Sequence, residues 1–152
     1  MTIRSVRADT LALRAGAYYV RIQAMAKKHH ISLAQEFDEQ DGDSTNYVLL
    51  LEDEFPIATA RMYLLNETTA MIGRVVVLPE YRHQGLGTKL MKECEAWAKE
   101  LGCDTAVVES RENKTAFYEQ LGYQITDDTL IEGETFRCIR MEKQIQEREG
   151  ET

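Results

Sequence analysis

Apolar and polar residues of this chain are arranged in short, regular patterns that predict its strands. Alternation at the N-terminus and several apolar runs bounded by turn residues indicate seven strands. The expected strands are residues 2–7, 46–52, 56–65, 68–78, 104–109, 122–126 and 135–142. Pro79 ends the fourth strand, because proline cannot donate a hydrogen bond to a neighbouring strand.

Helical periodicity is clearest over residues 86–101. One face of this segment is apolar and consists of Leu86, Leu90, Cys94, Trp97 and Leu101. Gly102 follows directly and is expected to cap the end of the helix. A shorter helix is expected over residues 114–121, with Asn113 as its N-cap and Gly122 at its end.

The N-terminal part of the chain predicts a helical region followed by a loop. Asp9 is expected to cap a helix over residues 10–28, with a break near Gly16. Residues 35–43 have the sequence Gln-Glu-Phe-Asp-Glu-Gln-Asp-Gly-Asp. These acidic and turn-forming residues predict an exposed loop, because they offer nothing to bury.

The order of the predicted elements is β-α-α-β-β-β-α-β-α-β-β, an α/β arrangement. Residues 68–109 form a strand, a helix and a strand, and the usual right-handed crossover places the two strands side by side in parallel. We therefore expect a single domain over residues 1–152, built on a mixed, twisted sheet. The charged tail, residues 143–152, is expected to fray.

Composition narrows the classes of function. The chain has 152 residues, of which 43% are hydrophobic and 29% charged, as in an ordinary globular protein. No stretch is long and apolar enough for a membrane span or a signal peptide, so a cytoplasmic location is expected. The net charge of −8 disfavours nucleic acid and favours cationic small molecules or lysine side chains.

Metal and thiol chemistry are not expected. Cys94, Cys103 and Cys138 form no Cys-x-x-Cys pair, and His29 and His30 are adjacent and would point in different directions on a helix. There is no ligand spacing typical of zinc sites. Cys94 belongs to the apolar helix face, which favours an inert core thiol over a nucleophile.

A glycine-spaced loop stands between the fourth strand and the long helix. Its sequence is Arg82-His-Gln-Gly85-Leu-Gly87-Thr88. Glycine lets a backbone approach a ligand closely, and the exposed amides at a helix start attract anions. A dinucleotide fingerprint would need glycine at position 90, which is leucine, and a P-loop would need Gly-Lys-Ser/Thr. Neither of these two phosphate loops is present.

The loop resembles the pyrophosphate loop of the GNAT superfamily of N-acetyltransferases, whose pattern is R/Q-x-x-G-x-G/A. A second block, Asn113-Lys-Thr-Ala-Phe117-Tyr118-Glu-Gln-Leu-Gly-Tyr, resembles the superfamily's N-x-x-A-x-x-F/Y-Y-x-x-x-G-F/Y segment with one residue fewer before the aromatic pair. The resemblance covers residues 68–126 and implies an acyl-CoA N-acyltransferase fold, with the sheet splayed between two parallel central strands.

The same resemblance implies acetyl-CoA as the acyl donor. Loop amides would bind its pyrophosphate, and the fourth strand would pair with its pantetheine arm. The residues implied in donor binding are Val75, Val76, Val77, Arg82, His83, Gln84, Gly85, Leu86, Gly87, Thr88, Asn113, Phe117 and Tyr118. Tyr118 matches the residue that commonly protonates the departing thiolate.

A general base is not identified by the resemblance. Members with a clear base often carry glutamate eleven positions before the loop's first residue, and Met71 stands there instead. Glu109 at the end of the parallel strand is one candidate for the base, Glu36 and Asp38 in the acidic segment are others, and ordered water is an alternative. In the acidic segment, Glu36 and Asp38 are candidates for attracting a cationic acceptor.

The expected function is transfer of an acetyl group from acetyl-CoA to a primary amine by direct attack in a ternary complex. Two alternatives stay open. One is an acyl-CoA-binding or regulatory domain with little turnover, and the other is an acetyltransferase acting on protein lysines or N-termini. The acceptor, the physiological acyl group and the existence of a homodimer are not determined by the sequence.

Overall fold

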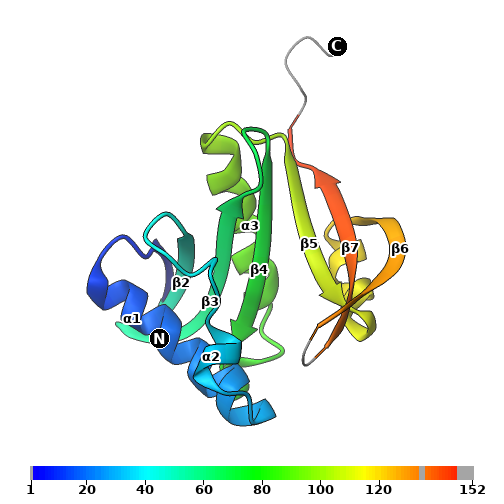
Figure 1. Cartoon of the computed structure of the whole chain (residues 1–152). Coiled ribbons are helices and arrows are strands. Elements are labelled where there is room, and N and C mark those ends of the chain that lie inside the picture. The colour runs from blue at the N-terminus through cyan, green and yellow to red at the C-terminus, as the bar shows by residue number, and fades with distance from the viewer. Residues whose placement is uncertain (1, 134–135, 147–152) are drawn as a thin grey trace. The chain divides into compact units, whose positions relative to one another are not determined.

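A computed structural model describes residues 2–133 and 136–146. The chain forms two compact units, residues 1–63 with 72–94, and residues 64–71 with 95–152. Strand β4 (Thr69–Val77) and helix α3 (Leu86–Glu100) each contribute to both units. Figure 1 shows the strands in the order that the sequence predicts.

In the first unit, three antiparallel strands are paired in sequence order. Strand β1 (Ile3–Arg7) pairs with β2 (Asn46–Glu52), and β2 pairs with β3 (Phe55–Leu64). The turn between β2 and β3 uses Asp53 and Glu54, whose φ angles are 51° and 92°. Apolar side chains within residues 47–51 of β2 and 57–62 of β3 are buried and form the core of this unit, whereas Phe55 at the start of β3 is exposed.

Helix α1 (Leu11–Arg21) begins one residue later than its sequence pattern indicates. The N-cap is Thr10, whose hydroxyl accepts a hydrogen bond from the Leu13 amide at 3.2 Å, so Asp9 is not the cap. The helix continues as a π-helical segment, Ile22–Lys27. The expected break near Gly16 is absent, and Gly16 instead allows close packing against Leu49 and Pro56.

A short helix, α2 (Leu33–Glu36), lies in the part of the chain that was expected to be a loop from residue 35. It begins with a capping box, in which Ser32 and Gln35 satisfy each other's backbone amides. The expectation that this acidic segment buries nothing is wrong, because Glu36 is only 2% exposed. Its partners are described with the site.

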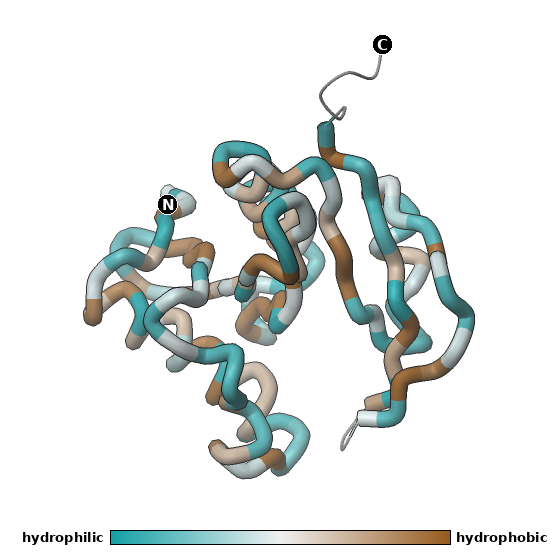
Figure 2. The backbone as a smooth tube through the Cα atoms, turned by 45° about the horizontal axis from the view of Figure 1, so that its top comes forward, coloured by the Kyte–Doolittle hydropathy of each residue, from teal (hydrophilic) through white to brown (hydrophobic). Residues whose placement is uncertain are grey.

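In the second unit, the start of β4 pairs in parallel with β5 (Thr105–Arg111), as the crossover predicts. Thr69, Ala70 and Met71 lie opposite Thr105, Ala106 and Val107. Figure 2 shows the apolar middle of β5 in brown, followed by a hydrophilic end. Helix α4 (Thr115–Gln120) follows after a 3₁₀ turn, Glu112–Lys114.

Strands β6 (Gln124–Glu132) and β7 (Arg137–Gln144) complete this unit, and both pair antiparallel. The strand order is β1-β2-β3-β4-β5-β7-β6, so the expected mixed α/β sheet is confirmed. The tail begins later than expected, because Lys143 and Gln144 belong to β7 and Ile145 is buried. Residues 147–152 of the expected tail lie outside the described residues.

Within residues 2–133 and 136–146, no helix is long and apolar enough to cross a membrane.

Candidate active site

The segment from β4 to α3 in the first unit has the strand, loop and helix that the sequence predicts. Val75, Val76 and Val77 end β4, and a 3₁₀ turn, Pro79–Tyr81, leads into the glycine loop. The turn is fixed by hydrogen bonds from the Leu78 amide to the Ile57 carbonyl and from the Tyr81 amide to the Leu78 carbonyl, both 2.9 Å. A strand edge and a helix start are thereby joined by a short, anchored connection.

Two residues of the loop adopt left-handed backbone angles. Gly85 has φ 75°, which glycine tolerates without strain, and His83 has φ 64°. Gly87 differs, because it lies inside α3 and has no positive φ. Arg82, His83 and Gln84 are exposed, whereas Leu86 is buried and attaches the helix to the core.

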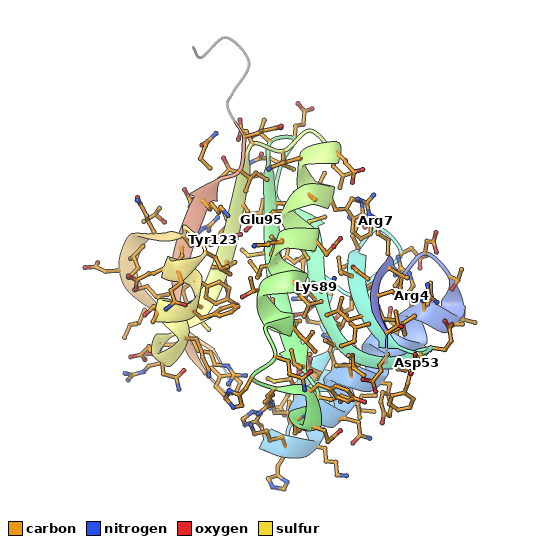
Figure 3. The ribbon with its side chains drawn as sticks, turned by 180° about the vertical axis from the view of Figure 1, so that it is seen from behind. Arg4, Arg7, Asp53, Lys89, Glu95 and Tyr123 are labelled. Atoms are coloured by element: carbon orange, nitrogen blue, oxygen red, sulfur yellow. The ribbon has the colours of Figure 1, made fainter. Side chains whose placement is uncertain are left out.

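The first amides of α3 have no carbonyl within the helix to which they can donate a hydrogen bond. Lys89 donates to the Gly85 carbonyl at 3.1 Å and makes the first helical bond, so the amides of Leu86, Gly87 and Thr88 precede the ladder. Such amides and the helix dipole favour an anion. Figure 3 labels Lys89 on this helix and shows the second face of the molecule.

The side chain of Tyr81 anchors the loop to a neighbouring strand. Its hydroxyl donates to Oε1 of Glu52, at the end of β2, at 2.7 Å. This hydrogen bond, with a smaller contribution from burial, raises the pKa of Tyr81 above its ordinary value. The loop is thus held at its first turn by a side chain that sequence reasoning missed.

The acidic segment of the first unit is bound to three arginines. We call the set Arg21, Arg61, Arg74, Glu36, Asp38 and Asp41 the arginine–carboxylate network; its formal charges cancel. Arg21 is fully buried and donates from Nε to Glu36 at 2.9 Å and from Nη1 to Asp41 at 2.6 Å. Its Nη2 also donates to the Glu36 carbonyl at 2.7 Å. Arg21 therefore satisfies two carboxylates and a backbone group.

Asp41 is the most strongly held carboxylate of the network. Burial by itself would raise its pKa, but hydrogen bonds from Arg21 and Tyr47, with the Asp38 amide, outweigh burial and hold the pKa of Asp41 far below its ordinary value. The buried Tyr47 hydroxyl has a raised pKa, first because of burial and then because it donates to Asp41.

Arg61 and Arg74 connect the network to β3 and β4. Arg61 donates to Asp38 at 2.8 Å and to Asp41 at 3.1 Å. Arg74 donates from Nη2 to Asp38 at 3.2 Å, and its Nε lies 3.6 Å from Glu36. Arg74 also has φ 47°, a conformation that costs a residue other than glycine roughly 1–2 kcal/mol. Strain of this kind persists only where the surroundings fix it.

The two carboxylates proposed from the sequence for acceptor binding differ in accessibility. The side chain of Glu36 is 3% exposed and paired with Arg21, so it does not face solvent. The side chain of Asp38 is 36% exposed, although it bridges two arginines. An acceptor could reach Asp38 and not Glu36.

The arginines had a signal in the sequence that was overlooked. Ala17, Val20 and Arg21 are the buried positions of α1, and their spacing places Arg21 on the apolar face of the helix. A charged residue on such a face needs a buried partner. The unmatched acidic segment that follows was the available candidate.

In the second unit, Tyr118 lies on α4 within a group of aromatic rings. Its ring makes edge-to-face contacts with Phe117 at 4.9 Å and with Tyr123 at 5.9 Å between centroids. The Tyr123 amide also donates to the Tyr118 carbonyl at 3.0 Å. Phe117 and Tyr118 are both half-buried.

Tyr123 is fixed by a buried carboxylate. Its hydroxyl donates to Oε2 of Glu95 on α3 at 2.8 Å, and the Lys143 ammonium donates to Oε1 of the same residue at 2.8 Å. Figure 3 shows the labelled Glu95 and Tyr123 near each other. Tyr123 is 1% exposed, so its hydroxyl has a structural partner. This contact was not expected from the sequence.

The remaining two candidates of the second unit are at the surface. Asn113 is exposed within the 3₁₀ turn, and the N-cap of α4 is Lys114, so the expected capping role of Asn113 is wrong. Glu109 is exposed on β5 and lies opposite Arg140 of β7 in the ladder. Met71, which replaces the frequent glutamate, is 7% exposed.

The surroundings of the histidine, cysteine and acidic side chains bear on metal binding and thiol reactivity. In the part of the chain that the structure describes, no three His, Cys, Asp or Glu residues are grouped to hold a metal ion. Cys94 is fully buried, and the pKa of Cys103 is raised by burial and then by nearby Asp104. These surroundings are those of inert structural thiols.

The sequence profile of the acetyltransferase (GNAT) family matches residues 13–123, which is more than half of the chain. The chain belongs to this family. It is therefore an acyltransferase, as the resemblance predicted. The Bacillus subtilis protein YyaT is 30% identical over 118 residues, which cover 76% of this chain and 79% of YyaT.

Solved structures of GNAT proteins have the same fold. A candidate N-acetyltransferase of Lactobacillus plantarum has a TM-score of 0.89 and 28% identity, covering 96% of this chain and all of the other. An aminoglycoside 6′-N-acetyltransferase crystallised with coenzyme A has a TM-score of 0.75, with 97% and 99% coverage. Its identity is 18%, so this second likeness concerns the fold alone.

Proposed function

We propose that this GNAT protein transfers the acetyl group of acetyl-CoA to a primary amine, with both reactants bound together. The observation that carries the proposal is segment 75–88, which joins a strand edge, a loop with two left-handed residues and a helix start with unpaired amides. This segment suits a ligand with an amide-bearing arm and a pyrophosphate. The coenzyme A complex of the aminoglycoside acetyltransferase supports the same donor.

In this proposal each part of the segment has a separate task. The backbone of Val75–Val77 pairs with the pantetheine arm, and amides from His83 to Thr88 bind the pyrophosphate. Arg82 borders the loop and contributes positive charge. Asn113 and Phe117 complete the donor contacts that the family resemblance implies.

The proposed chemistry takes the role of Tyr118 from the family resemblance. The neutral amine attacks the thioester carbonyl, a C–N bond forms, and the backbone amide of Val77 stabilises the oxyanion. The C–S bond then breaks, and the Tyr118 hydroxyl protonates the leaving thiolate. The proton lost by the amine goes to ordered water or to Glu109. Holding both reactants together supplies much of the rate.

Acceptor recognition is proposed from the exposed acids of the first unit. Asp38 and Glu39 are exposed, and their charges favour a cationic amine. Glu36 contributes only indirectly, because its carboxylate is buried against Arg21. We accordingly expect the acidic segment to have a modest effect on acceptor affinity.

The experiment that tests the function is a panel of amines and lysine peptides incubated with acetyl-CoA. Thiol release that depends on the amine, with an acetylated product of the expected mass, supports the proposal. Saturable acetyl-CoA binding without turnover of any amine would favour the binding-domain alternative, for which the apolar Met71 is the specific observation. Acetylation restricted to lysines or N-termini in a protein mixture would favour the protein-acetyltransferase alternative.

A further inference from the structure

Arg74 occupies an unusual position in the strand that is proposed to hold the donor. It has φ 47° within β4, directly before Val75–Val77. A left-handed residue redirects the strand after it, because it breaks the regular alternation of side chains and peptide groups. Gly73, Arg74 and Val75 are all half-buried. The direction of the following peptides therefore depends on Arg74.

The side chain of Arg74 is held from two directions. Asp38 accepts a hydrogen bond from its Nη2 at 3.2 Å, and Glu36 lies 3.6 Å from its Nε. Both carboxylates are themselves fixed, Asp38 by Arg61 and Glu36 by the buried Arg21. The guanidinium of Arg74 thus reaches an anchored framework rather than a freely moving surface group.

We propose that Arg74 is a positioning residue for the acyl donor. Its contacts with Glu36 and Asp38 maintain the left-handed backbone at position 74 and so set the peptides of Val75–Val77 against the pantetheine arm. This inference rests on the proposed function and assigns the acidic segment a task at the donor strand. The proposal requires no change in the loop that binds the pyrophosphate.

Two ligands separate the strand from the loop. Coenzyme A contains the pantetheine arm, whereas adenosine 3′-phosphate 5′-diphosphate contains only the nucleotide with its diphosphate. In Arg74→Ala, the dissociation constant of coenzyme A should rise about tenfold, because a preorganised strand is lost. The dissociation constant of the nucleotide should stay within about twofold of wild type. Calorimetry with each folded variant measures both constants.

Variants at one position distinguish backbone from side chain. Arg74→Gly removes the ion pairs but still permits φ 47°, so its loss should be smaller than that of Arg74→Ala. Arg74→Lys keeps a cation that can reach Asp38 and should restore most of the affinity. Arg4→Ala is the matched control, because Arg4 forms an exposed ion pair with Glu54 in the same unit and should leave both constants unchanged.

Several results would overturn the proposal. One is wild-type coenzyme A affinity in folded Arg74→Ala, and another is an equal weakening of both ligands, which indicates a general structural role. Where Arg74→Ala does not fold, Arg74→Gly and Asp38→Asn replace it, and the change in the dissociation constant of coenzyme A is again compared with the change for the nucleotide.

Gly87→Val should weaken the binding of both ligands. Unchanged binding in that variant, or no binding by wild type, would overturn the proposed function itself rather than the role of Arg74.

Discussion

The glycine loop and the acidic segment lie in the same unit and use their polar groups in opposite ways. The loop leaves Arg82, His83 and Gln84 exposed, with the first amides of α3 beside them. In the acidic segment, Glu36 and Asp41 are buried against Arg21, and Asp38 bridges two further arginines. Exposed polar groups can meet a ligand, whereas groups that are already paired mainly fix the fold.

The second unit contains two tyrosines that differ in burial. Tyr123 is buried and its hydroxyl is bonded to Glu95, while Tyr118 is half-buried on a short helix. The residue type is the same, and the surroundings separate a structural role from a proposed catalytic one. Each contrast can be tested by removing one member and comparing activity with stability.

The largest effect is expected at Tyr118. Tyr118→Phe keeps the ring and removes the hydroxyl, so kcat should fall by roughly 10²- to 10⁴-fold, as for loss of a general acid. Donor affinity and stability should change little. Tyr123→Phe is the matched control and should lower the free energy of unfolding by about 1–3 kcal/mol, because Glu95 loses a buried donor.

Steady-state kinetics with the best amine and urea unfolding of both variants provide the comparison. An unchanged kcat in Tyr118→Phe, under conditions where chemistry limits the rate, would reduce Tyr118 to a packing residue.

The next effect concerns the arginine–carboxylate network. Arg21→Ala leaves Glu36 and Asp41 buried without their main partner, so the free energy of unfolding should fall by about 3–5 kcal/mol. Arg4→Ala breaks an exposed pair with Glu54 and should cost about 1 kcal/mol or less. Urea unfolding measures both. Equal losses in the free energy of unfolding would show that the buried network stabilises the protein no more than the exposed ion pair does.

Acid should weaken the first unit through Asp41. The pKa of Asp41 is lower in the folded state than in the unfolded chain, so its contribution is complete above the ordinary aspartate pKa of about 4. As pH falls below this value, the unfolded state binds a proton first and stability decreases. Through Asp41, the free energy of unfolding should fall by up to about 1.4 kcal/mol for each pH unit of acidification.

This dependence is measured by urea unfolding between about pH 5 and pH 3, where the ordinary aspartate titrates. Asp41→Asn should be less stable at neutral pH and should lose less stability on acidification. If the free energy of unfolding of Asp41→Asn falls as steeply with acidification as that of wild type, other carboxylates cause the acid sensitivity.

The smallest effect is expected for the exposed acid Glu39. Glu39→Gln should raise KM for a cationic amine by no more than about threefold at low salt, because an exposed charge acts through a screened field. The difference should vanish as salt is added. A much larger change in KM would show that the exposed part of the acidic segment contacts the acceptor directly.

Local features of the fold were predictable and contacts between distant segments were not. The strands, the α3 helix and its Gly102 end depend on neighbouring residues, and the structure confirms them. The burial of Glu36 depends on Arg21, 15 residues earlier. The left-handed angle at Arg74 depends on carboxylates 36 and 38 residues before it. The position of Arg21 on the apolar face of α1 indicates that it needs a buried acidic partner, but the sequence does not identify which carboxylate it pairs with or the contacts of Arg74.

Residues near element ends show a second limit. Both Asp9 and Thr10 are suitable caps, and the choice between them depends on where the helix meets the core rather than on propensity. Asn113 has the right chemistry for a cap, but the 3₁₀ turn shifts the start of α4 beyond it. The sequence therefore predicts the proposed donor-binding segment better than the proposed acceptor-binding residues.

The exposed strand β6 has a consequence for handling the protein in solution. All nine residues of this edge strand are exposed, including Ile125, Leu130 and Ile131, so it could recruit another strand. The β6–β7 ladder is irregular on both sides of Asp127, which pairs with Arg140. Asp127 accepts a hydrogen bond from the Thr129 amide, which lowers the pKa of Asp127. The sequence has a pI of about 4.9, so colloidal repulsion between molecules is weakest near that pH, and association through this edge is easiest there.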